Sequence, residues 1–168
     1  MRIRAGPMGA LGLLITLAAA PAIAGKKECA EHGEKLYVEQ PAMVDIQQAF
    51  KHCRPLAEAG DGEAQYYFAS VHMFRTISQP PANPLVEKWM KLSAGNGYGK
   101  AQFYMATVYR YGNALTAPDI PRMMEMYEKA AAQGVPPAMQ ALVELYRGKD
   151  PKKAQYWKEQ LEKQRCCR

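Results

Sequence analysis

A single glycine recurs at equal spacing along the middle of this chain, at Gly60, Gly97 and Gly134, each 37 residues from the next. Similar residues also follow each glycine at offsets of four, eight and eleven. These columns hold Ala64, Ala101 and Ala138; Phe68, Met105 and Leu142; and Val71, Val108 and Leu145. Self-similarity at such a period is typical of repeat proteins, whose units cannot bury their apolar faces alone and therefore stack.

The spacing inside each unit predicts two helices. The recurring offsets put the apolar side chains on one stripe of an α-helix. The first helices are therefore expected over 62–74, 99–111 and 136–147. Asn or Asp followed by proline marks the start of a helix, because the polar side chain caps it and proline is tolerated in the first turn. The second helices are expected to start at Asn83-Pro84, Asp119-Ile120-Pro121 and Asp150-Pro151.

Glycine is expected to end these second helices at Ala94-Gly95 and Gln133-Gly134, because it readily adopts the left-handed conformation. One more helix is expected before Gly60. It carries Met43, Ile46, Phe50, Cys53 and Ala57 at helical spacing. Pro55 lies within it and is expected to kink it or to limit its straight part to the residues before the proline.

The last predicted helix has the pattern of a cap. Ala154, Trp157 and Leu161 line one side, and lysine and glutamate fill the other. The expected fold is therefore all-α: an α/α solenoid of antiparallel helix pairs, with about three repeats and a C-terminal capping helix. We divide the chain into a signal peptide (1–24), an N-terminal extension (25–42) and a repeat domain (43–168).

Three stretches carry a family resemblance: "EAGDGEAQYYFASVH", "GNGYGKAQFYMATVYRYG" and "MYEKAAAQGVPPAMQALVELYRG". They resemble the Sel1-like repeat family, which is related to tetratricopeptide repeats, over roughly residues 43–164. The chain departs from the family pattern at His72, which replaces a tyrosine, and at Ala69 and Ala106, which replace a glycine. The third copy also has Val135-Pro136-Pro137 where a small or acidic residue is usual. The resemblance implies a scaffold for protein contacts and no shared reaction.

The first 24 residues read as an export signal. Arg2 and Arg4 precede an apolar run from Met8 to Ala20, and Ala22-Ile23-Ala24 forms a small-residue cleavage site. The run is too short to span a bilayer as a helix. Cleavage near Ala24, export to a bacterial periplasm and the absence of a transmembrane segment are therefore expected.

Four cysteines in an oxidising compartment favour disulfides, and three pairings are possible if all four pair internally: Cys29, Cys53, Cys166 and Cys167. The favoured pair is Cys29 with Cys53, which would hold residues 25–40 against the helix before Gly60. The alternative is that Cys53 is a small core residue. Adjacent cysteines seldom bridge each other, so Cys166 or Cys167 is expected to reach elsewhere in the fold or to bond another chain.

The charge of the chain is concentrated at its end. The formal net charge is +6, yet residues 25–148 hold thirteen basic and thirteen acidic side chains, whereas residues 149–168 hold seven and three. A neutral body argues against nucleic-acid binding, which needs a basic stripe. The basic tail suggests weak attraction to an anionic partner or membrane surface, and the alternative is a solvated cap.

The sequence contains no recognisable catalytic or metal-binding motif. His32, His52 and His72 do not form a metal-ligand pattern and are expected to make hydrogen bonds on or between helices. The serines Ser70, Ser78 and Ser93 lack a lysine three residues later, as Ser-x-x-Lys chemistry would need. No enzyme activity, cofactor or metal is therefore expected.

Aromatic residues in two columns suggest a contact surface on the concave face of the first helices. Offsets of seven and fourteen give Tyr67, Phe74, Tyr104 and Tyr111, with Ser70 and Thr107 between them and Arg110 and Arg147 at the edge. Tyrosine and arginine are favoured interface anchors, so we predict that this patch binds a partner protein. The alternative is that the rings pack between neighbouring helices.

The predicted function is thus a periplasmic protein-interaction module or adaptor whose partner is another protein. A second hypothesis follows from the resemblance, because exported Sel1-like proteins include immunity proteins. The chain would then neutralise a secreted antibacterial effector, for example a phospholipase. No residue points to that role, and a neighbouring toxin gene would distinguish it from a general adaptor.

Overall fold

The computed structural model describes residues 19–37, 41–75 and 83–166. Within these ranges the regular structure consists of α-helices, which confirms the all-α prediction. The helices are α1 (Ala19–Lys35), α2 (Met43–Glu58), α3 (Gly62–Arg75), α4 (Pro84–Gly95), α5 (Gly99–Tyr111), α6 (Ile120–Ala132), α7 (Pro136–Tyr146) and α8 (Pro151–Cys166). No helix in these ranges is long and apolar enough to cross a bilayer.

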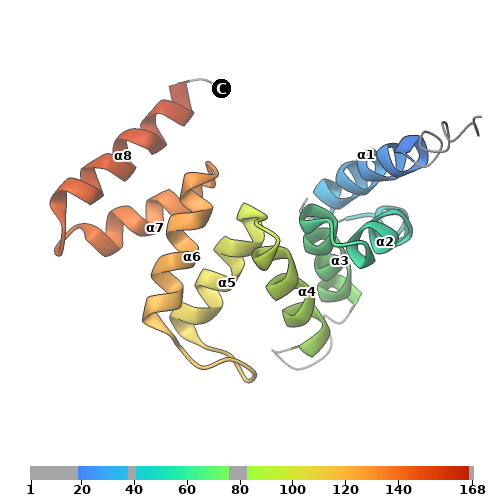
Figure 1. Ribbon diagram of the computed structural model, residues 1–168, viewed down its shortest axis with the longest axis horizontal. Helices are drawn as coiled ribbons and strands as arrows, with labels where there is room; N and C mark the ends of the chain where they lie inside the picture. Colours follow the sequence, from blue (N-terminus) through green and yellow to red (C-terminus); the bar gives the residue numbers. More distant parts are fainter. Residues whose placement is uncertain (1–18, 38–40, 76–82, 167–168) are drawn as a thin grey trace, which may run out of the picture.

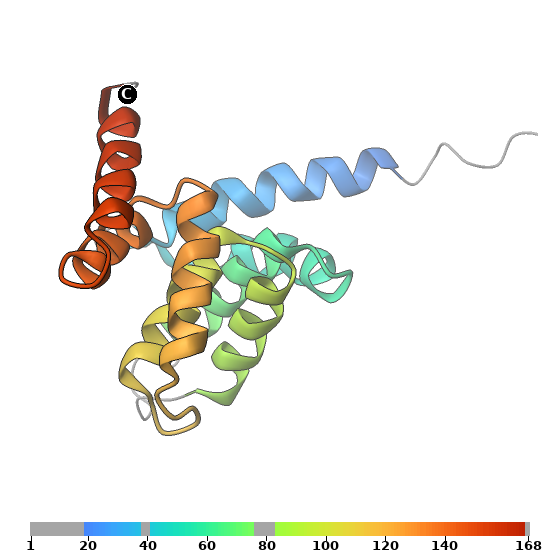
Figure 2. The ribbon, with the colours of Figure 1, turned by 60° about the vertical axis from the view of Figure 1, so that its left-hand side comes forward.

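The helices form an arc of antiparallel pairs (Figure 1). Each helix packs against the next one along the chain, and α1 also packs against α3. In two views α1 and α8 lie at opposite ends of the arc (Figures 1 and 2). The molecule is therefore an α/α solenoid, and α8 is the last of its described helices.

The repeated glycines end one pair and begin the next. Gly60, Gly97 and Gly134 have φ angles of 95°, 88° and 80°, which place all three in the left-handed region. In each turn the amide after the glycine bonds a carbonyl five residues earlier. These bonds are Asp61 N to Leu56 O at 3.0 Å, Tyr98 N to Ser93 O at 3.1 Å and Val135 N to Ala130 O at 3.2 Å. Each turn is therefore a Schellman motif, which satisfies carbonyls that the helix end leaves unpaired.

The predicted end of α4 at Ala94-Gly95 is confirmed, but Gly95 does not supply the left-handed conformation. Gly95 is the last residue of α4, and the left-handed conformation belongs to Gly97, two residues later. The helix starts agree with the sequence. The Asn83 side chain accepts a bond from Leu85 N at 2.9 Å, and Asp119 accepts one from Arg122 N at 3.0 Å. Helix α2 continues through Pro55 to Glu58, so the proline does not end it.

The segment expected as an N-terminal extension contributes a helix of the solenoid. Helix α1 packs against α2 and α3, so it belongs to the stack of helices. It also follows the 37-residue period, because Gly25 precedes Gly62 by that distance. The columns that are apolar elsewhere hold Lys27, Glu31 and Glu34 in α1, and all three are exposed. No earlier pair in the described residues packs on α1, and Glu34 is instead paired with Tyr67 of α3 and Lys100 of α5.

Two groups of buried side chains form the core. The first joins α1 to α5, and the second joins α5 to α8. The first contains the disulfide between Cys29 and Cys53, with an S–S distance of 2.09 Å, which confirms the favoured pairing. Cys53 is also fully buried, so it is a core residue as well. Cys166 is the last residue of α8 and Cys167 lies outside the described residues, so the predicted pairing of these two is not described.

Buried glutamines repeat the same hydrogen bonds in consecutive units. Gln65 Nε2 donates to Ala57 O at 3.1 Å, and Gln102 Nε2 donates to Ala94 O at 3.2 Å. Each glutamine also accepts a bond from the next unit: Asn96 Nδ2 donates to Gln65 Oε1 at 2.9 Å, and Gln133 Nε2 donates to Gln102 Oε1 at 2.7 Å. These bonds fix the stacking of one pair on the next, because a buried amide without partners is costly.

Candidate protein-interaction surface

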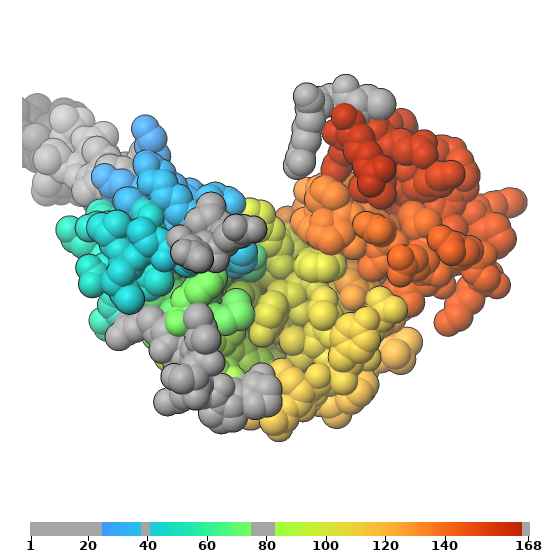
Figure 3. All heavy atoms as spheres, turned by 180° about the vertical axis from the view of Figure 1, so that it is seen from behind, coloured from blue at the N-terminus to red at the C-terminus, as the bar shows by residue number. Residues whose placement is uncertain are grey.

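A groove opens on the hollow side of the arc, over the first turns of α5 and α7. It has a volume of about 530 Å³. In the space-filling view the hollow lies between the N-terminal and C-terminal helices, and α5 (yellow) contributes to its floor (Figure 3). The lining residues are Tyr66, Tyr98, Gly99, Lys100, Phe103, Gln133, Gly134, Val135, Pro136 and Pro137. The groove is therefore lined mainly by aromatic and aliphatic side chains, as in many ligand and peptide sites.

One wall of the groove is built from tyrosines. The ring of Tyr66 lies 5.2 Å from that of Tyr98 and 5.7 Å from that of Tyr37, measured between ring centroids. Burial raises the pKa of the Tyr98 hydroxyl above its ordinary value, so this group stays protonated and donates to Tyr67 Oη at 3.5 Å. The wall thus presents closely packed aromatic rings, and the hydroxyl of Tyr98 is engaged in a hydrogen bond.

The opposite wall is the start of α7. Val135 precedes the helix, and Pro136 and Pro137 form its first turn. Helix α5 approaches this wall closely, because a Cβ atom at Gly99 would stand 3.0 Å from Val135 Cγ2. Prolines have no backbone N–H and pre-set φ, so this wall presents a fixed aliphatic surface.

A charged cluster holds Lys100 at the edge of the groove. Lys100 Nζ lies 2.5 Å from Glu34 Oε1, and the Tyr67 hydroxyl donates to the same carboxylate oxygen. Burial alone raises the pKa of Glu34, but the hydrogen bonds from Lys100 and Tyr67 outweigh it, so the pKa lies below its ordinary value of 4.5. The ionised carboxylate therefore connects α1, α3 and α5 beside the groove.

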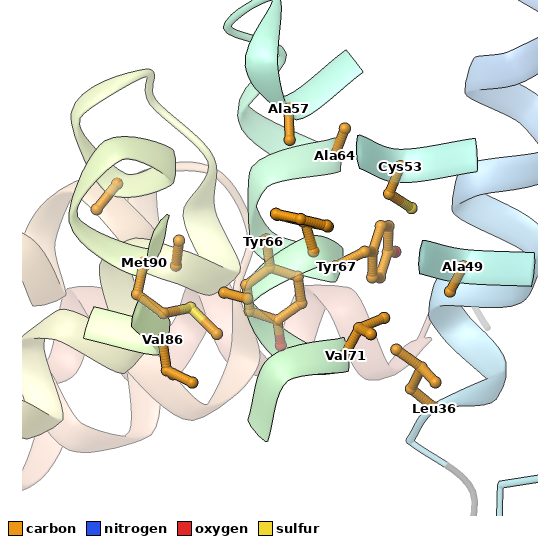
Figure 4. Packing of buried hydrophobic residues seen from close by; sticks show 14 of the residues in the cluster. Leu36, Ala49, Cys53, Ala57, Ala64, Tyr66, Tyr67, Val71, Val86 and Met90 are labelled. Carbon is orange, nitrogen blue, oxygen red and sulfur yellow. The ribbon is translucent and has the colours of Figure 1, made fainter. Parts of the chain in front are cut away.

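Two residues of the predicted surface are buried, which corrects the prediction for both. Tyr67 and Ser70 are each 0% exposed. The Tyr67 ring lies on the side of Cys53, whereas that of Tyr66 lies on the side of Val86 and Met90 (Figure 4). Both Tyr67 and Ser70 pack between helices, because this side of α3 faces the preceding pair. For the Tyr67 ring, this is the alternative interpretation given above.

The other predicted residues are divided among several places. Phe74 and Tyr104 are half-buried against the first core group. The half-buried Thr107 donates to the Phe103 carbonyl at 3.1 Å. The Arg110 guanidinium lies 5.2 Å from the ring centroid of Tyr111, which is 68% exposed at the end of α5. Arg147 is exposed beside α8. The eight residues therefore do not form one continuous exposed patch.

Sequence reasoning missed the residues that line the groove. Tyr66 and Phe103 each precede a predicted residue by one position, and they form the column six residues after the repeated glycine. A step of one residue turns about 100° around a helix. The sequence did contain a signal for these residues, because this column is aromatic in both units.

Hydrogen bonds were expected for all three histidines, and two of them, His32 and His52, confirm the expectation. His32 Nδ1 lies 2.9 Å from Asp45 Oδ1, and His52 Nε2 lies 3.2 Å from Gln48 Oε1. In the described ranges, no group of three or more His, Cys, Asp or Glu residues is arranged to hold a metal ion. The His32–Asp45 contact joins α1 to α2, whereas the His52–Gln48 contact lies within α2.

Solved structures share this arc of helix pairs. A protective antigen of uropathogenic Escherichia coli that displays an SLR fold is similar with a TM-score of 0.62 and 21% identity, over 87% of this chain and 34% of that chain. A Sel1 repeat protein from Oxalobacter formigenes is similar with a TM-score of 0.64 and 23% identity, over 83% of this chain and 42% of that chain. The fold is therefore that of Sel1-like repeat proteins.

The chain spans between about a third and two fifths of the length of these two proteins. No family model matches the sequence, and no curated protein matches it. The similarity thus establishes the α/α solenoid of the Sel1-like type, and the function has to be argued from the surface itself.

Proposed function

We propose that the chain is a protein-interaction module that binds a segment of a partner protein in the groove over α5 and α7. The observation that carries this proposal is the groove itself, which has a volume of about 530 Å³ and holds Tyr66, Tyr98 and Phe103 on its surface. Aromatic side chains in pockets dominate the binding energy of many protein interfaces. Rigid walls on both sides lower the entropy cost of binding.

The groove selects apolar side chains of the partner. Pro136 and Pro137 offer aliphatic surface on one wall, and the tyrosine rings offer aromatic faces on the other. Lys100 is already paired with Glu34, so it marks the edge of the groove rather than its anchor. Tyr111 and Arg110, at the other end of α5, are a proposed second contact that would extend the interface along the helix.

The proposed location is the periplasm. Residues 1–24 have the pattern of a cleaved export signal, although residues 1–18 lie outside the described residues. The buried disulfide between Cys29 and Cys53 supports export, because disulfides persist in oxidising compartments. As an adaptor, the chain would hold another exported protein.

The immunity hypothesis uses the same groove with a different occupant. In that case the bound segment would belong to a secreted antibacterial effector, and binding would block the effector. No contact among the described residues favours this partner over another, so the adaptor role is the one we propose. The identity of the protein captured by the groove would separate the two.

Capture of a partner from periplasmic extract tests the proposal. The full chain is expressed with its own leader, recovered from the periplasmic fraction and compared with Tyr98→Ala and Pro137→Glu. Pro137 is exposed in the first turn of α7, where glutamate is tolerated, so this variant is expected to keep its thermal midpoint. We expect the captured protein to bind either variant at least roughly tenfold more weakly, a loss of about 1.4 kcal/mol.

The matched control is Tyr156→Ala, which removes an exposed tyrosine of α8 that does not line this groove. It should capture the same protein with unchanged affinity. Equal capture by wild type, Tyr98→Ala and Pro137→Glu would contradict the proposal.

A further inference from the structure

The last pair of the solenoid leaves open the face that earlier pairs bury. In α3 and α5 the residues nine positions after the repeated glycine are Ala69 and Ala106, and both are 0% exposed. The equivalent residue of α7 is Val143, which lies on a groove of about 460 Å³ between α7 and α8. Within the described residues no further pair follows α8 (Figures 1 and 2). We name the groove between α7 and α8 the end groove.

The end groove has an apolar floor. Val143 of α7 and Ala154 and Leu161 of α8 line it. Ala154 is 8% exposed and packs in the second core group, and Leu161 is partly buried against the same group. The floor is therefore continuous with the core that joins α5 to α8, and it offers apolar surface to one more element.

Positive charge surrounds this floor. Arg147, Lys158 and Arg165 line the end groove together with a single carboxylate, Glu144. Arg147, Lys158 and Arg165 are exposed, and in the described part of the chain none of them forms an ion pair within 4.0 Å. The other polar side chains of the lining, Gln140 and Gln155, are neutral amides. The site therefore has an excess of cations available to a ligand.

We infer that the end groove binds an amphipathic α-helix of a partner protein, with carboxylates beside its apolar stripe. The shape follows from the repeat, because this is the face on which the first helix of a following pair would pack. The charge follows from Arg147, Lys158 and Arg165, which would pair with acidic side chains on both sides of an apolar stripe.

The chemistry of the end groove disfavours another Sel1-like pair, including one from a second copy. Position six after the repeated glycine holds Tyr66 and Phe103 in the earlier units but Gln140 in α7, and position ten holds Ser70 and Thr107 but Glu144. A closely packed apolar pair would bury Gln140 and Glu144 without partners, which is costly. An acidic partner helix that stays partly solvated would instead leave Gln140 and Glu144 at the edge of the interface, in contact with water.

Selection from a peptide library tests this inference. The probe is a displayed library of helical peptides of about 16 residues, roughly 24 Å long, with a fixed apolar stripe and randomised flanking positions. It is selected on the full chain and rescreened on Arg147→Glu/Lys158→Glu. We expect the selection to enrich net acidic peptides whose affinity falls at least roughly tenfold in the double variant. Their affinity should also fall as salt rises.

The matched control is Lys152→Glu/Lys163→Glu, which makes the same change of net charge on exposed residues of α8 that do not line the end groove. It should retain most of the affinity. Failure to enrich peptides that depend on the two cations, or enrichment of neutral or basic ones, would overturn the inference. A dimer that the Arg147→Glu/Lys158→Glu variant dissociates would assign the end groove to a second copy and overturn it too.

This inference does not depend on the groove over α5 and α7. Pro137→Glu should leave the selected peptides bound, because Pro137 lines only that other groove. Loss of the peptides in both Pro137→Glu and the control double variant would indicate nonspecific binding and contradict the end groove as the site.

Discussion

Gly33 of α1 lies directly against the ring of Tyr67 of α3: a Cβ atom at residue 33 would stand 2.3 Å from Tyr67 Cγ. Tyr67 is 0% exposed, and its hydroxyl donates to Glu34. The ring is thus held on both sides and cannot move away without breaking that contact. The absence of a side chain at Gly33 sets the distance at which the first pair packs on the second.

Gly33→Ala is therefore expected to destabilise the fold, although alanine favours helices. Forcing an extra carbon into a close-packed site costs about 1–3 kcal/mol. The free energy of unfolding, measured by urea titration, should fall by this amount. Gly95→Ala is the control, because a Cβ atom there meets nothing within 4 Å and Gly95 ends a helix. It should be neutral or stabilising, and an equal loss in both variants would rule out the packing explanation.

The repeat made most of the solenoid predictable from sequence. Two equal spacings located the turns at Gly60, Gly97 and Gly134, and the Asn or Asp before each proline located the helix starts. Local rules suffice here because turns and caps depend on a few neighbouring residues. Helix α1 escaped detection, because its stripe columns hold the charged residues Lys27, Glu31 and Glu34 where the later units hold apolar ones. The apolar pattern that identifies a helix is therefore absent from these columns.

The candidate site was harder to predict than the fold. The column with Tyr67 and Tyr104 was predicted to face outward, yet Tyr67 packs toward the preceding pair, and the groove holds Tyr66 and Phe103 instead. Adjacent residues on a helix differ by about 100° in direction. Which aromatic column faces the hollow depends on how one pair is rotated against the next, and a single sequence does not report that rotation.

The disulfide between Cys29 and Cys53 is expected to stabilise the N-terminal pair. It closes a segment with a sequence separation of 24. A cross-link of this span lowers the conformational entropy of the unfolded chain and thereby stabilises the fold by about 3 kcal/mol. Cys29→Ala/Cys53→Ala should therefore unfold at lower denaturant concentration than oxidised wild type. A reductant should lower the unfolding midpoint of the wild type to a value similar to that of the variant. It should leave the midpoint of the variant unchanged.

The control for this experiment is Cys166→Ala/Cys167→Ala, which keeps the buried disulfide. Its midpoint should still fall on reduction. If reductant no longer affected this control, the stabilising bond would involve the C-terminal cysteines instead.

Gln102→Leu is expected to weaken the stacking of consecutive pairs. The change removes the bond that Gln102 Nε2 donates to Ala94 O and the bond that Gln102 Oε1 accepts from Gln133 Nε2. A buried polar group left without a partner costs about 1–3 kcal/mol. The unfolding free energy should fall within this range, as measured by denaturant titration. Gln155→Leu on α8, where Gln155 is exposed and bonds Glu159, should change it by less than about 0.5 kcal/mol. Similar effects of the two substitutions would contradict a role for the buried amide.

The ionised carboxylate of Asp61 stabilises the fold, and this contribution is lost at acid pH. Its carboxylate accepts bonds from Ala64 N at 2.9 Å and from Lys26 Nζ at 2.7 Å. Burial alone raises the pKa of Asp61, but the bond from Lys26, the bond from the Ala64 amide and the attraction of Lys26 outweigh it. The pKa in the folded state is therefore below the ordinary value of 3.8.

A carboxyl group with a lowered pKa binds fewer protons in the folded state than in the unfolded one, so its contribution is present above the unfolded pKa and is lost as pH falls through the folded pKa. Asp61→Asn keeps a capping side chain but removes the charge. Its thermal midpoint should lie below that of wild type at about pH 6, and the gap should narrow below about pH 4. Asp150→Asn is the matched control, because Asp150 accepts a bond from Lys153 N at the start of α8 and forms no ion pair among the described residues. A gap for Asp61→Asn that stayed constant from about pH 6 to pH 2 would show that the ionised carboxylate of Asp61 does not stabilise the junction of α1 with α3.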